Sequence, residues 1–459
     1  MADCLNGGGK AGNFTNLDGT EQKMVSASAP PARRGFVGAC FFVYMGLLTC
    51  VAVIAFILGC YSVNKVRNPD YPESALTSNL GTVPDGYSVF SLGTGLGYWS
   101  QATAMNHSRS DHGVVAVGKY AYLIGGVSDE GPNGTARVLD SIVRYDTETG
   151  LMTEMATMLA PRYRFAYAVL NGNIYVMGGT DSAAQDALPT DTVMVYNVGA
   201  NKWTYGDKLS APRIDPCGAA VAGKVYVFGG YNETFGSLAS VEELDPTTAS
   251  ATSPAVWNKL PASSNLAVSR GDCRAVAVDK TIYAVGGAEY YINPNKSCDG
   301  DLWINCYRFL RSVEAFDPAT KTWTPRASMV NARGDFGIEA LPGGRIIVAG
   351  GERGNGVANQ QAMYEVEEYV AADNIWITKA PLPEARFRDD LAFVNGRVYA
   401  FGGAPTCGQV PGADCYQVAL RSVFAYFDVQ YPRLYAAYKA ASASAPRAAT
   451  SRRMLLRRR

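Results

Sequence analysis

The sequence predicts an all-β protein built from six repeated units that follow one N-terminal transmembrane helix. The repeats are marked by a Gly-Gly pair ending a β-rich run, six times at intervals of 51 to 64 residues, with second glycines at Gly126, Gly179, Gly230, Gly287, Gly351 and Gly403. The helix is indicated by an uncharged stretch from Gly35 to Asn64. Of all residues 47% are hydrophobic and 18% are charged, and acidic and basic groups are equal in number. This composition excludes a wholly disordered chain and gives no basis for nucleic-acid binding.

Residues 35–62 form the predicted transmembrane helix. The uncharged run from Phe36 to Tyr61 would span roughly 39 Å as a helix, which exceeds a bilayer core of about 30 Å. A buried globular helix and a cleaved signal peptide are the alternatives, but a signal peptide carries a shorter apolar run close to the N-terminus. Arg33 and Arg34 place the N-terminal side in the cytoplasm. Residues 1–34 are then a disordered cytoplasmic tail, and the domain after the helix lies outside the cell or in a lumen of the secretory pathway.

Cysteines and sequons after the helix support an oxidising exterior. Two predicted loops each hold two cysteines at a spacing that suits a local disulfide, Cys298 with Cys306 and Cys407 with Cys415. Cys217 and Cys273 hold nearly equivalent places in successive repeats, and we expect them to form a third disulfide. Candidate glycosylation sites are Asn106, Asn133, Asn232 and Asn295. Because an oxidising setting disfavours free thiolates, we expect no zinc site, no other metal and no cofactor.

Each repeat reads as four strands. Two Val- and Tyr-rich runs joined by a short turn precede the Gly-Gly pair, as in AYAVLNGNIYVMGG, and predict a hairpin of two buried strands. A third strand follows a variable loop. A fourth carries a tryptophan in four repeats, at Trp203, Trp257, Trp323 and Trp376.

The glycine pairs, the aromatic strand after each of them and the spaced tryptophans resemble the kelch repeat family, over about Tyr87 to Val429. The resemblance implies a six-bladed β-propeller over residues 87–429, with four-stranded blades around an axis. The sixth repeat lacks its tryptophan strand, whereas Trp99 lies in an unassigned run ahead of the first repeat. We therefore expect an N-terminal strand to close the last blade beside residues 422–428. Residues 63–86 are a predicted linker, and residues 430–459 a basic, low-complexity tail.

One face of the propeller is the predicted binding surface. The loop entering each first strand contains an arginine, and in four repeats an aspartate follows two residues later. These groups would form a charged ring at one channel mouth, where arginines bind carboxylates; the alternative is that they brace neighbouring blades. In kelch adaptors of ubiquitin ligases such loop arginines contact acidic peptides, which implies a usable face here. The candidate ligand-binding residues are Arg109, Arg162, Arg164, Arg213, Arg270, Arg333, Asp335, Arg353, Arg386, Arg388, Asp389 and Trp303.

Trp303 belongs to a long aromatic insertion in the fourth repeat, which we interpret either as a hydrophobic lid or as a platform for a sugar or protein. All four sequons fall on the same face, so glycans would leave free access mainly over blades two, five and six.

The predicted function is a membrane-anchored module that binds a protein or a glycan, with no nucleic-acid partner. The chain has only two histidines, His107 and His112, and both lie in one stretch. This disfavours the copper radical oxidases found among kelch propellers, which need histidines from separate loops. A carbohydrate-acting enzyme of the mutarotase or isomerase kind remains the alternative, because it would need only arginines and carboxylates in the channel.

Overall fold

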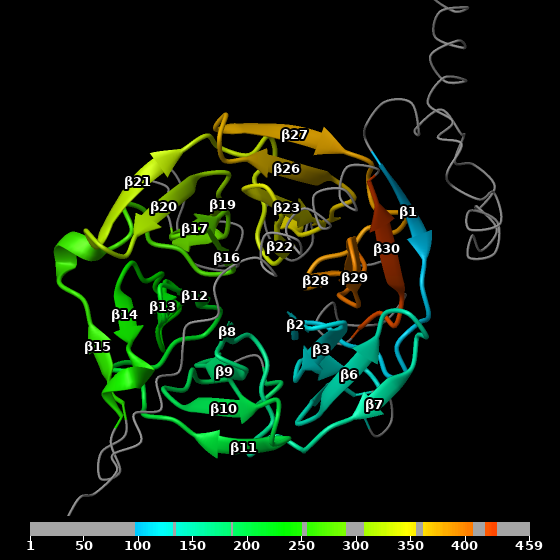
Figure 1. Cartoon of the computed structure of the whole chain (residues 1–459), viewed down its shortest axis with the longest axis horizontal. Helices are drawn as coiled ribbons and strands as arrows, with labels where there is room; N and C mark the ends of the chain where they lie inside the picture. The colour runs from blue at the N-terminus through cyan, green and yellow to red at the C-terminus, as the bar shows by residue number, and fades with distance from the viewer. Residues whose placement is uncertain are drawn as a thin grey trace, which may run out of the picture. The chain divides into compact units, whose positions relative to one another are not determined.

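The computed structural model describes residues 97–131, 135–184, 187–249, 255–290, 307–354, 361–406 and 418–428. Six four-stranded antiparallel sheets stand in a ring, each with one strand innermost (Figure 1). The innermost strands contact their neighbours in the order β2, β8, β12, β16, β22, β28 and back to β2. The predicted all-β, six-bladed propeller is therefore confirmed.

The blades are numbered in chain order, and their strands run outward from the axis. Blade one consists of β2 (Gly113–Val117), β3 (Tyr120–Ile124), β6 (Ile142–Asp146) and β7 (Met152–Glu154). Blade two consists of β8 (Ala166–Leu170), β9 (Asn173–Met177), β10 (Val193–Asn197) and β11 (Lys202–Tyr205). Blade three consists of β12 (Cys217–Val221), β13 (Lys224–Phe228), β14 (Val241–Leu244) and β15 (Trp257–Lys259). Blade four consists of β16 (Arg274–Val278), β17 (Thr281–Val285), β20 (Val313–Asp317) and β21 (Thr322–Arg326). Blade five consists of β22 (Gly337–Leu341), β23 (Arg345–Ala349), β26 (Val366–Val370) and β27 (Ile375–Lys379). Blade six consists of β28 (Asp390–Val394), β29 (Arg397–Phe401), β30 (Val423–Phe427) and β1 (Tyr98–Gln101).

Within the described residues, three blades carry a small two-stranded sheet in the loop between their second and third strands. These sheets are β4 (Val127–Ser128) with β5 (Arg137–Val138), β18 (Ala288–Tyr290) with β19 (Tyr307–Phe309), and β24 (Glu352–Arg353) with β25 (Gln361–Ala362). The helices of the described residues are two short 3₁₀ turns, Pro246–Thr248 and Ala262–Ser264. Because chain direction alternates along a blade, these small sheets lie on the same face as the loops that enter the first strands.

The glycine pairs are required where neighbouring blades approach most closely. A Cβ atom on Gly229 would lie 2.5 Å from the carbonyl oxygen of Arg270, which belongs to the next blade. The backbone N–H of Gly230 donates a hydrogen bond to that same oxygen, at 2.8 Å. Both glycines have positive φ, a backbone conformation that residues with a side chain rarely adopt. The same contact recurs at all six junctions, including that from blade six back to blade one.

The N-terminal strand closes the ring as predicted. Strand β1 pairs antiparallel with β30, with Trp99 opposite Tyr426. The indole N–H of Trp99 donates to the carbonyl of Ala380, which follows the outer strand of blade five, at 2.9 Å. In blade two, Trp203 makes the equivalent bond to Ala156, which follows the outer strand of blade one. Trp99 therefore takes the place of the tryptophan that the sixth repeat lacks.

Among the residues that the structure describes, no helix is long and apolar enough to cross a bilayer. The predicted cytoplasmic tail, transmembrane helix, linker and basic tail all lie outside the described residues. These four assignments stay predictions.

Candidate functional site at the propeller axis

The arginine that precedes each first strand lies inside its own blade. We call these six residues the wall arginines, and each is at most 3% exposed: Arg109, Arg162, Arg213, Arg270, Arg333 and Arg386. In every blade one Nη1 donates to the carbonyl of the first glycine of the pair, at 2.7 to 3.0 Å. The other donors of the guanidinium reach the start of the third strand, as Arg270 Nη2 does to Ser312 Oγ at 3.1 Å.

This placement differs from the expected ligand-binding ring. The wall arginines hold the second and third strands of one blade together, so their guanidinium groups are buried and occupied by the blade itself. The alternative, that these arginines brace the structure, agrees better with their placement, although their guanidinium groups join strands of one blade and not neighbouring blades. Between blades it is the backbone carbonyl of each wall arginine that bonds the preceding glycine pair.

Three wall arginines have a buried glutamate partner that sequence analysis did not single out. Glu242, Glu314 and Glu367 each occupy the second position of a third strand and pair with Arg213, Arg270 and Arg333 at 2.9, 2.6 and 2.6 Å. Each glutamate also accepts a backbone N–H from the segment between blades, for example from Ser210 at 2.7 Å. The repeated glutamate in VEEL, VEAFD and VEEYV was the available signal. Its absence from the other three blades hid its structural role.

A second set of residues, two positions after the wall arginines, faces the axis. We call these the axis residues: Asp111, Arg164, Asp215, Asp272, Asp335 and Arg388. All six have φ between 48° and 57°, in the left-handed region that residues other than glycine rarely adopt. Backbone hydrogen bonds join neighbours around the axis, as in Asp335 N–H to Asp272 O at 3.0 Å and Asp111 N–H to Arg388 O at 3.0 Å. The carboxylates of blades one, three and five approach within 4.8 Å of one another, which is possible only on the axis.

The two positive axis residues pair with neighbouring carboxylates. Arg164 Nε donates to Asp215 at 2.6 Å. Arg388 Nε lies 3.4 Å from Asp111 and 3.5 Å from Asp335, in the blades on either side of it. Four of these five residues, Asp111, Asp215, Asp335 and Arg388, are at most 5% exposed, and the side chain of Arg164 is 16% exposed. Of the predicted site residues, the structure thus brings Arg164, Asp335 and Arg388 together.

Carboxylates outnumber cations near the axis, and burial raises the pKa values of Asp111, Asp215, Asp272 and Glu352. Burial, opposed by Arg388, raises the pKa of Asp111 to about 7. Glu352 of β24 has its pKa raised to about 8 by burial and then by Asp335. Asp272, whose Oδ2 accepts a hydrogen bond from the Tyr231 hydroxyl at 2.8 Å, has its pKa raised by burial and by its two acidic neighbours. The axis therefore favours bound protons or another source of positive charge.

Further titratable groups line the start of the inner strands. Asp389 is fully buried, both its carboxyl oxygens lack a hydrogen-bond partner, and burial raises its pKa to about 8. Asp390 accepts hydrogen bonds from Val114 N–H at 2.7 Å and from the Tyr167 hydroxyl, and burial raises its pKa to about 6. Burial and nearby arginines lower the pKa of His112, so its imidazole is neutral. Of this group only Asp389 was a predicted site residue.

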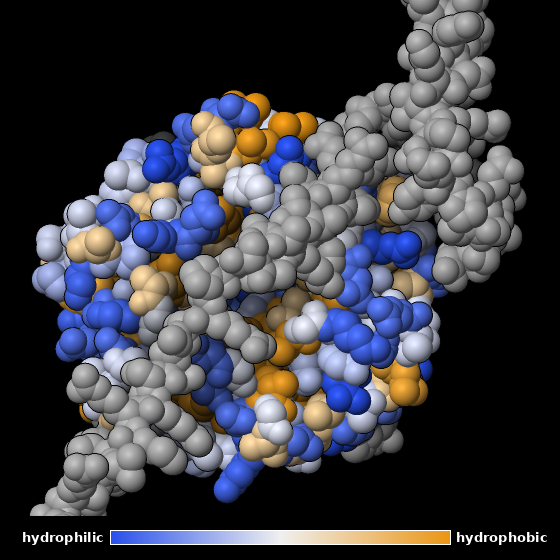
Figure 2. All heavy atoms as spheres, viewed as in Figure 1, coloured by the Kyte–Doolittle hydropathy of each residue, from blue (hydrophilic) through white to orange (hydrophobic). Residues whose placement is uncertain are grey.

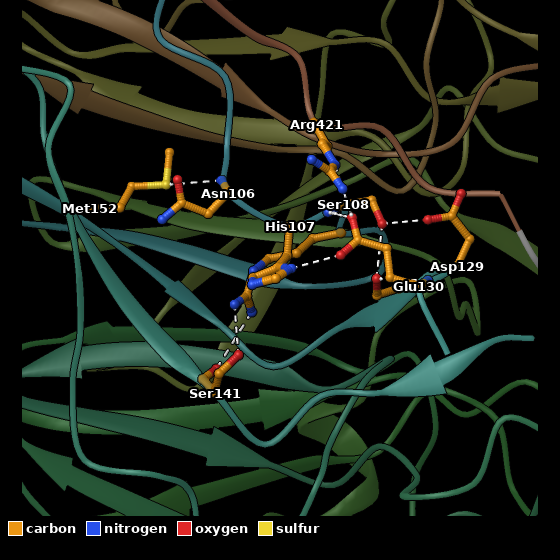
Figure 3. A network of polar contacts seen from close by, with 10 residues as sticks. Asn106, His107, Ser108, Asp129, Glu130, Ser141, Met152 and Arg421 are labelled. Atoms are coloured by element: carbon orange, nitrogen blue, oxygen red, sulfur yellow. Dashed lines mark hydrogen bonds and ion pairs between the residues drawn. The ribbon is translucent and has the colours of Figure 1, made fainter. Parts of the chain in front are cut away.

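A polar network crosses the closing seam between blades six and one (Figure 3). Glu130 accepts hydrogen bonds from the Ser108 N–H at 3.0 Å and pairs with His107 at 2.6 Å. Arg421, just before β30, binds the same carboxylate at 2.6 Å. Burial opposes ionisation, but these three partners lower the pKa of Glu130 to about 2. Arg421 and His107 are more than half exposed, so the network forms part of the open face.

The remaining predicted site residues divide between the surface and the segments outside the described residues. Arg353 is exposed and pairs with Glu365 at 2.6 Å, and the sequons Asn106 and Asn232 are exposed. The predicted Cys217–Cys273 disulfide is present and joins blades three and four, with a Cα–Cα distance of 5.7 Å. The other predicted residues lie outside the described part of the chain: Asn133, Asn295, Cys298, Cys306, Trp303, Cys407 and Cys415.

Comparisons with known proteins agree with this architecture. A family model of the kelch motif matches residues 108–159, 161–210, 212–250 and 298–330. Kelch-like protein 36 of Mus musculus is 25% identical over 290 residues, which cover 62% of this chain and 42% of that protein. Kelch repeat and BTB domain-containing protein 12 of Homo sapiens is 32% identical over 149 residues, covering 29% of this chain and 23% of that protein.

A solved structure described as "Structure of YjhT" aligns with a TM-score of 0.53 and 14% identity over 70% of this chain and 95% of that chain, a likeness that concerns the fold alone. Fold and repeats together define a β-propeller of kelch type. The chain carries kelch motifs and is similar to proteins of the kelch repeat family. It spans about two fifths of the length of curated relatives such as kelch-like protein 36.

Proposed function

We propose that the chain is a membrane-anchored binding module whose propeller, outside the cell or in a lumen of the secretory pathway, binds a protein or a glycan. The observation that carries this proposal is the chemistry of the face formed by the second-to-third-strand loops. The wall arginines serve the fold beneath this face, so its exposed side chains are available for recognition. Relatives named kelch-like proteins support a binding role by analogy, which is a weaker argument than the surface itself.

Charged and aromatic side chains supply the contacts. Tyr290 of β18 is 37% exposed and Tyr364, which follows β25, is 49% exposed. The side chains of Arg353 and Arg421 are 45% and 55% exposed. Tyrosine and arginine are the residue types that contribute most to binding energy at protein interfaces. Both also suit a glycan, because tyrosine rings stack on sugars and arginine forks bind carboxylates.

Hydrophilic residues are interspersed with small apolar groups over the face seen in Figure 2. Such a mixed surface is typical of non-obligate interfaces. A carbohydrate-acting enzyme is not favoured, because the axis carboxylates that would act as acid and base are at most 5% exposed. A sugar could not reach them without displacing the backbone ring described above.

Binding assays on the purified full-length chain test the proposal, using a glycan array and proximity labelling in cells. For a ligand so found, Arg353→Ala and Tyr364→Ala should each weaken binding at least tenfold. Lys280→Ala and Leu151→Ala are matched controls, because Lys280 and Leu151 are exposed in first-to-second- and third-to-fourth-strand turns on the opposite face. These should change affinity less than twofold. Equal losses on both faces would contradict the assigned surface.

Localisation needs a separate experiment. In intact cells, a protease added outside should digest the propeller but leave an N-terminal tag protected, and N-glycosidase should increase gel mobility. A protease-resistant propeller that carries no glycan, in cells and in isolated vesicles, would contradict the proposed orientation.

A further inference from the structure

Negative charge gathers on one side of the axis. The axis residues of blades three, four and five are all aspartates, Asp215, Asp272 and Asp335, and Glu352 of β24 joins them. The axis arginines lie elsewhere in the ring, in blades two and six. Arg164 pairs with Asp215, and Arg388 lies between Asp111 and Asp335. Among the axis aspartates, Asp272 is the one whose neighbours in the ring, Asp215 and Asp335, are both acidic.

Two carboxyl oxygens in this group lack any hydrogen-bond partner. They are Oδ1 of Asp272 and Oδ1 of Asp335, in residues that are 2% and 4% exposed. The second oxygen of Asp272 is occupied by the Tyr231 hydroxyl, and that of Asp335 faces Arg388. Buried polar atoms are almost always satisfied, since leaving one unpaired costs free energy. The two orphaned atoms therefore point to a missing positive partner.

The spacing of the oxygens indicates which partner fits. Ligand atoms of Asp272, Asp335 and Glu352 lie within 4.8 Å of one another, and so do those of Asp111, Asp215 and Asp335. The two groups share Asp335. Opposite ligands on Ca²⁺ are about 4.8 Å apart, because Ca–O distances are about 2.4 Å. Mg²⁺ requires a tighter octahedron and keeps its waters, while Zn²⁺ favours nitrogen and sulfur ligands, which neither group contains.

We propose that the propeller axis binds one Ca²⁺ beside Asp335, held by Asp272, Asp335 and Glu352, with Asp111 and Asp215 completing its oxygen shell. Several carboxylates and few competing cations suit a divalent ion that accepts irregular all-oxygen coordination. The aspartates stand on backbone fixed by the hydrogen-bonded ring, so the ligands are held in place before the ion arrives. The ion would join blades one, three, four and five from within. Neither the family assignment nor the proposed binding face requires it.

Direct binding measurements on the full-length chain test this site. After treatment with a chelator and its removal, equilibrium dialysis with radioactive calcium should show one ion per chain. Thermal unfolding should shift upward as CaCl₂ is added, while MgCl₂ at equal concentration should shift it less. Absence of bound calcium at millimolar concentration, or stoichiometric zinc binding in its place, would overturn the proposal.

Asp272→Asn is the informative variant, because it keeps the shape and an oxygen that accepts from Tyr231 but removes one charge. Its calcium dissociation constant should rise at least tenfold. Without calcium it should unfold at the same temperature as the parent or higher, since a repulsive charge is gone; this result separates loss of the ion from loss of the fold. Asp317→Asn, at an exposed strand end, is the matched control and should bind calcium like the parent. Unchanged calcium affinity in Asp272→Asn would refute the site.

Discussion

The wall arginines and the axis residues lie two positions apart in every blade, yet they behave differently. The wall position is arginine six times, and each guanidinium bonds its own blade's glycine carbonyl. The axis position is aspartate four times and arginine twice, and its side chains meet across blades. Uniformity from blade to blade therefore marks a residue that builds the repeat. Variation at a fixed backbone position marks a place where the assembled ring carries its own charge pattern.

The largest expected effect follows from removing a wall arginine. Arg333→Ala should lower the free energy of unfolding by about 3–5 kcal/mol, because it leaves Glu367 buried without its charged partner. Denaturant unfolding of the full-length chain measures this loss. Arg353→Ala is the control, since its exposed ion pair should contribute about 0.2–1 kcal/mol. Similar losses in the two variants would show that the wall arginines are dispensable.

Asp389 extends this comparison to the pH dependence of stability. Because burial raises its pKa from 3.8 to about 8, the folded state retains a proton that the unfolded chain has released. This contribution to stability is present below about pH 4 and is lost as the pH rises to 8. Asp389→Asn should then be more stable than the parent by on the order of 2 kcal/mol at pH 9, and equal to it at pH 4. Denaturant unfolding at both pH values is the measurement, and a pH-independent difference would argue against a buried neutral carboxyl.

The tryptophans allow a finer comparison of two blades. Trp99 donates its indole N–H to Ala380, whereas the buried indole nitrogen of Trp257 has no hydrogen-bond partner. Both changes to phenylalanine remove similar volume. Trp99→Phe should therefore cost about 1 kcal/mol more than Trp257→Phe, the net contribution of one hydrogen bond. Thermal and denaturant unfolding of both variants would detect the difference, and equal costs would mean that the closing strand gains nothing from this bond.

The smallest effect is expected at the seam. Arg421→Ala removes an ion pair whose arginine side chain is 55% exposed, so stability should fall by about 0.5 kcal/mol and less at high salt. A salt series of unfolding curves measures this. A loss of unfolding free energy as large as that of Arg333→Ala would mean that the seam network makes a major contribution to the stability of the closed ring.

The fold was predictable because its determinants repeat. Six glycine pairs and their following strands indicated the blades, and the displaced Trp99 indicated the closing strand. The roles of the arginines were not predictable from their spacing. The axis residues differ from the wall arginines in that all six have positive φ, a conformation that the residue type does not indicate at Arg164 or Arg388. Glu314 was missed for a related reason, since a glutamate inside a strand reads as solvent-facing until its buried arginine is known.

Each wall arginine contacts two blades at once. Its backbone carbonyl accepts a hydrogen bond from the glycine pair of the preceding blade, and its guanidinium donates hydrogen bonds to its own blade. No blade can therefore complete its hydrogen bonds without its neighbour. The last blade takes its outer strand from the segment ahead of the first blade, and its glycine pair bonds a carbonyl of the first blade. In linear repeat arrays units can be trimmed from an end and the remainder stays folded. This circle has no end to trim, so deletion of any single blade should abolish cooperative unfolding altogether, instead of yielding a smaller ring.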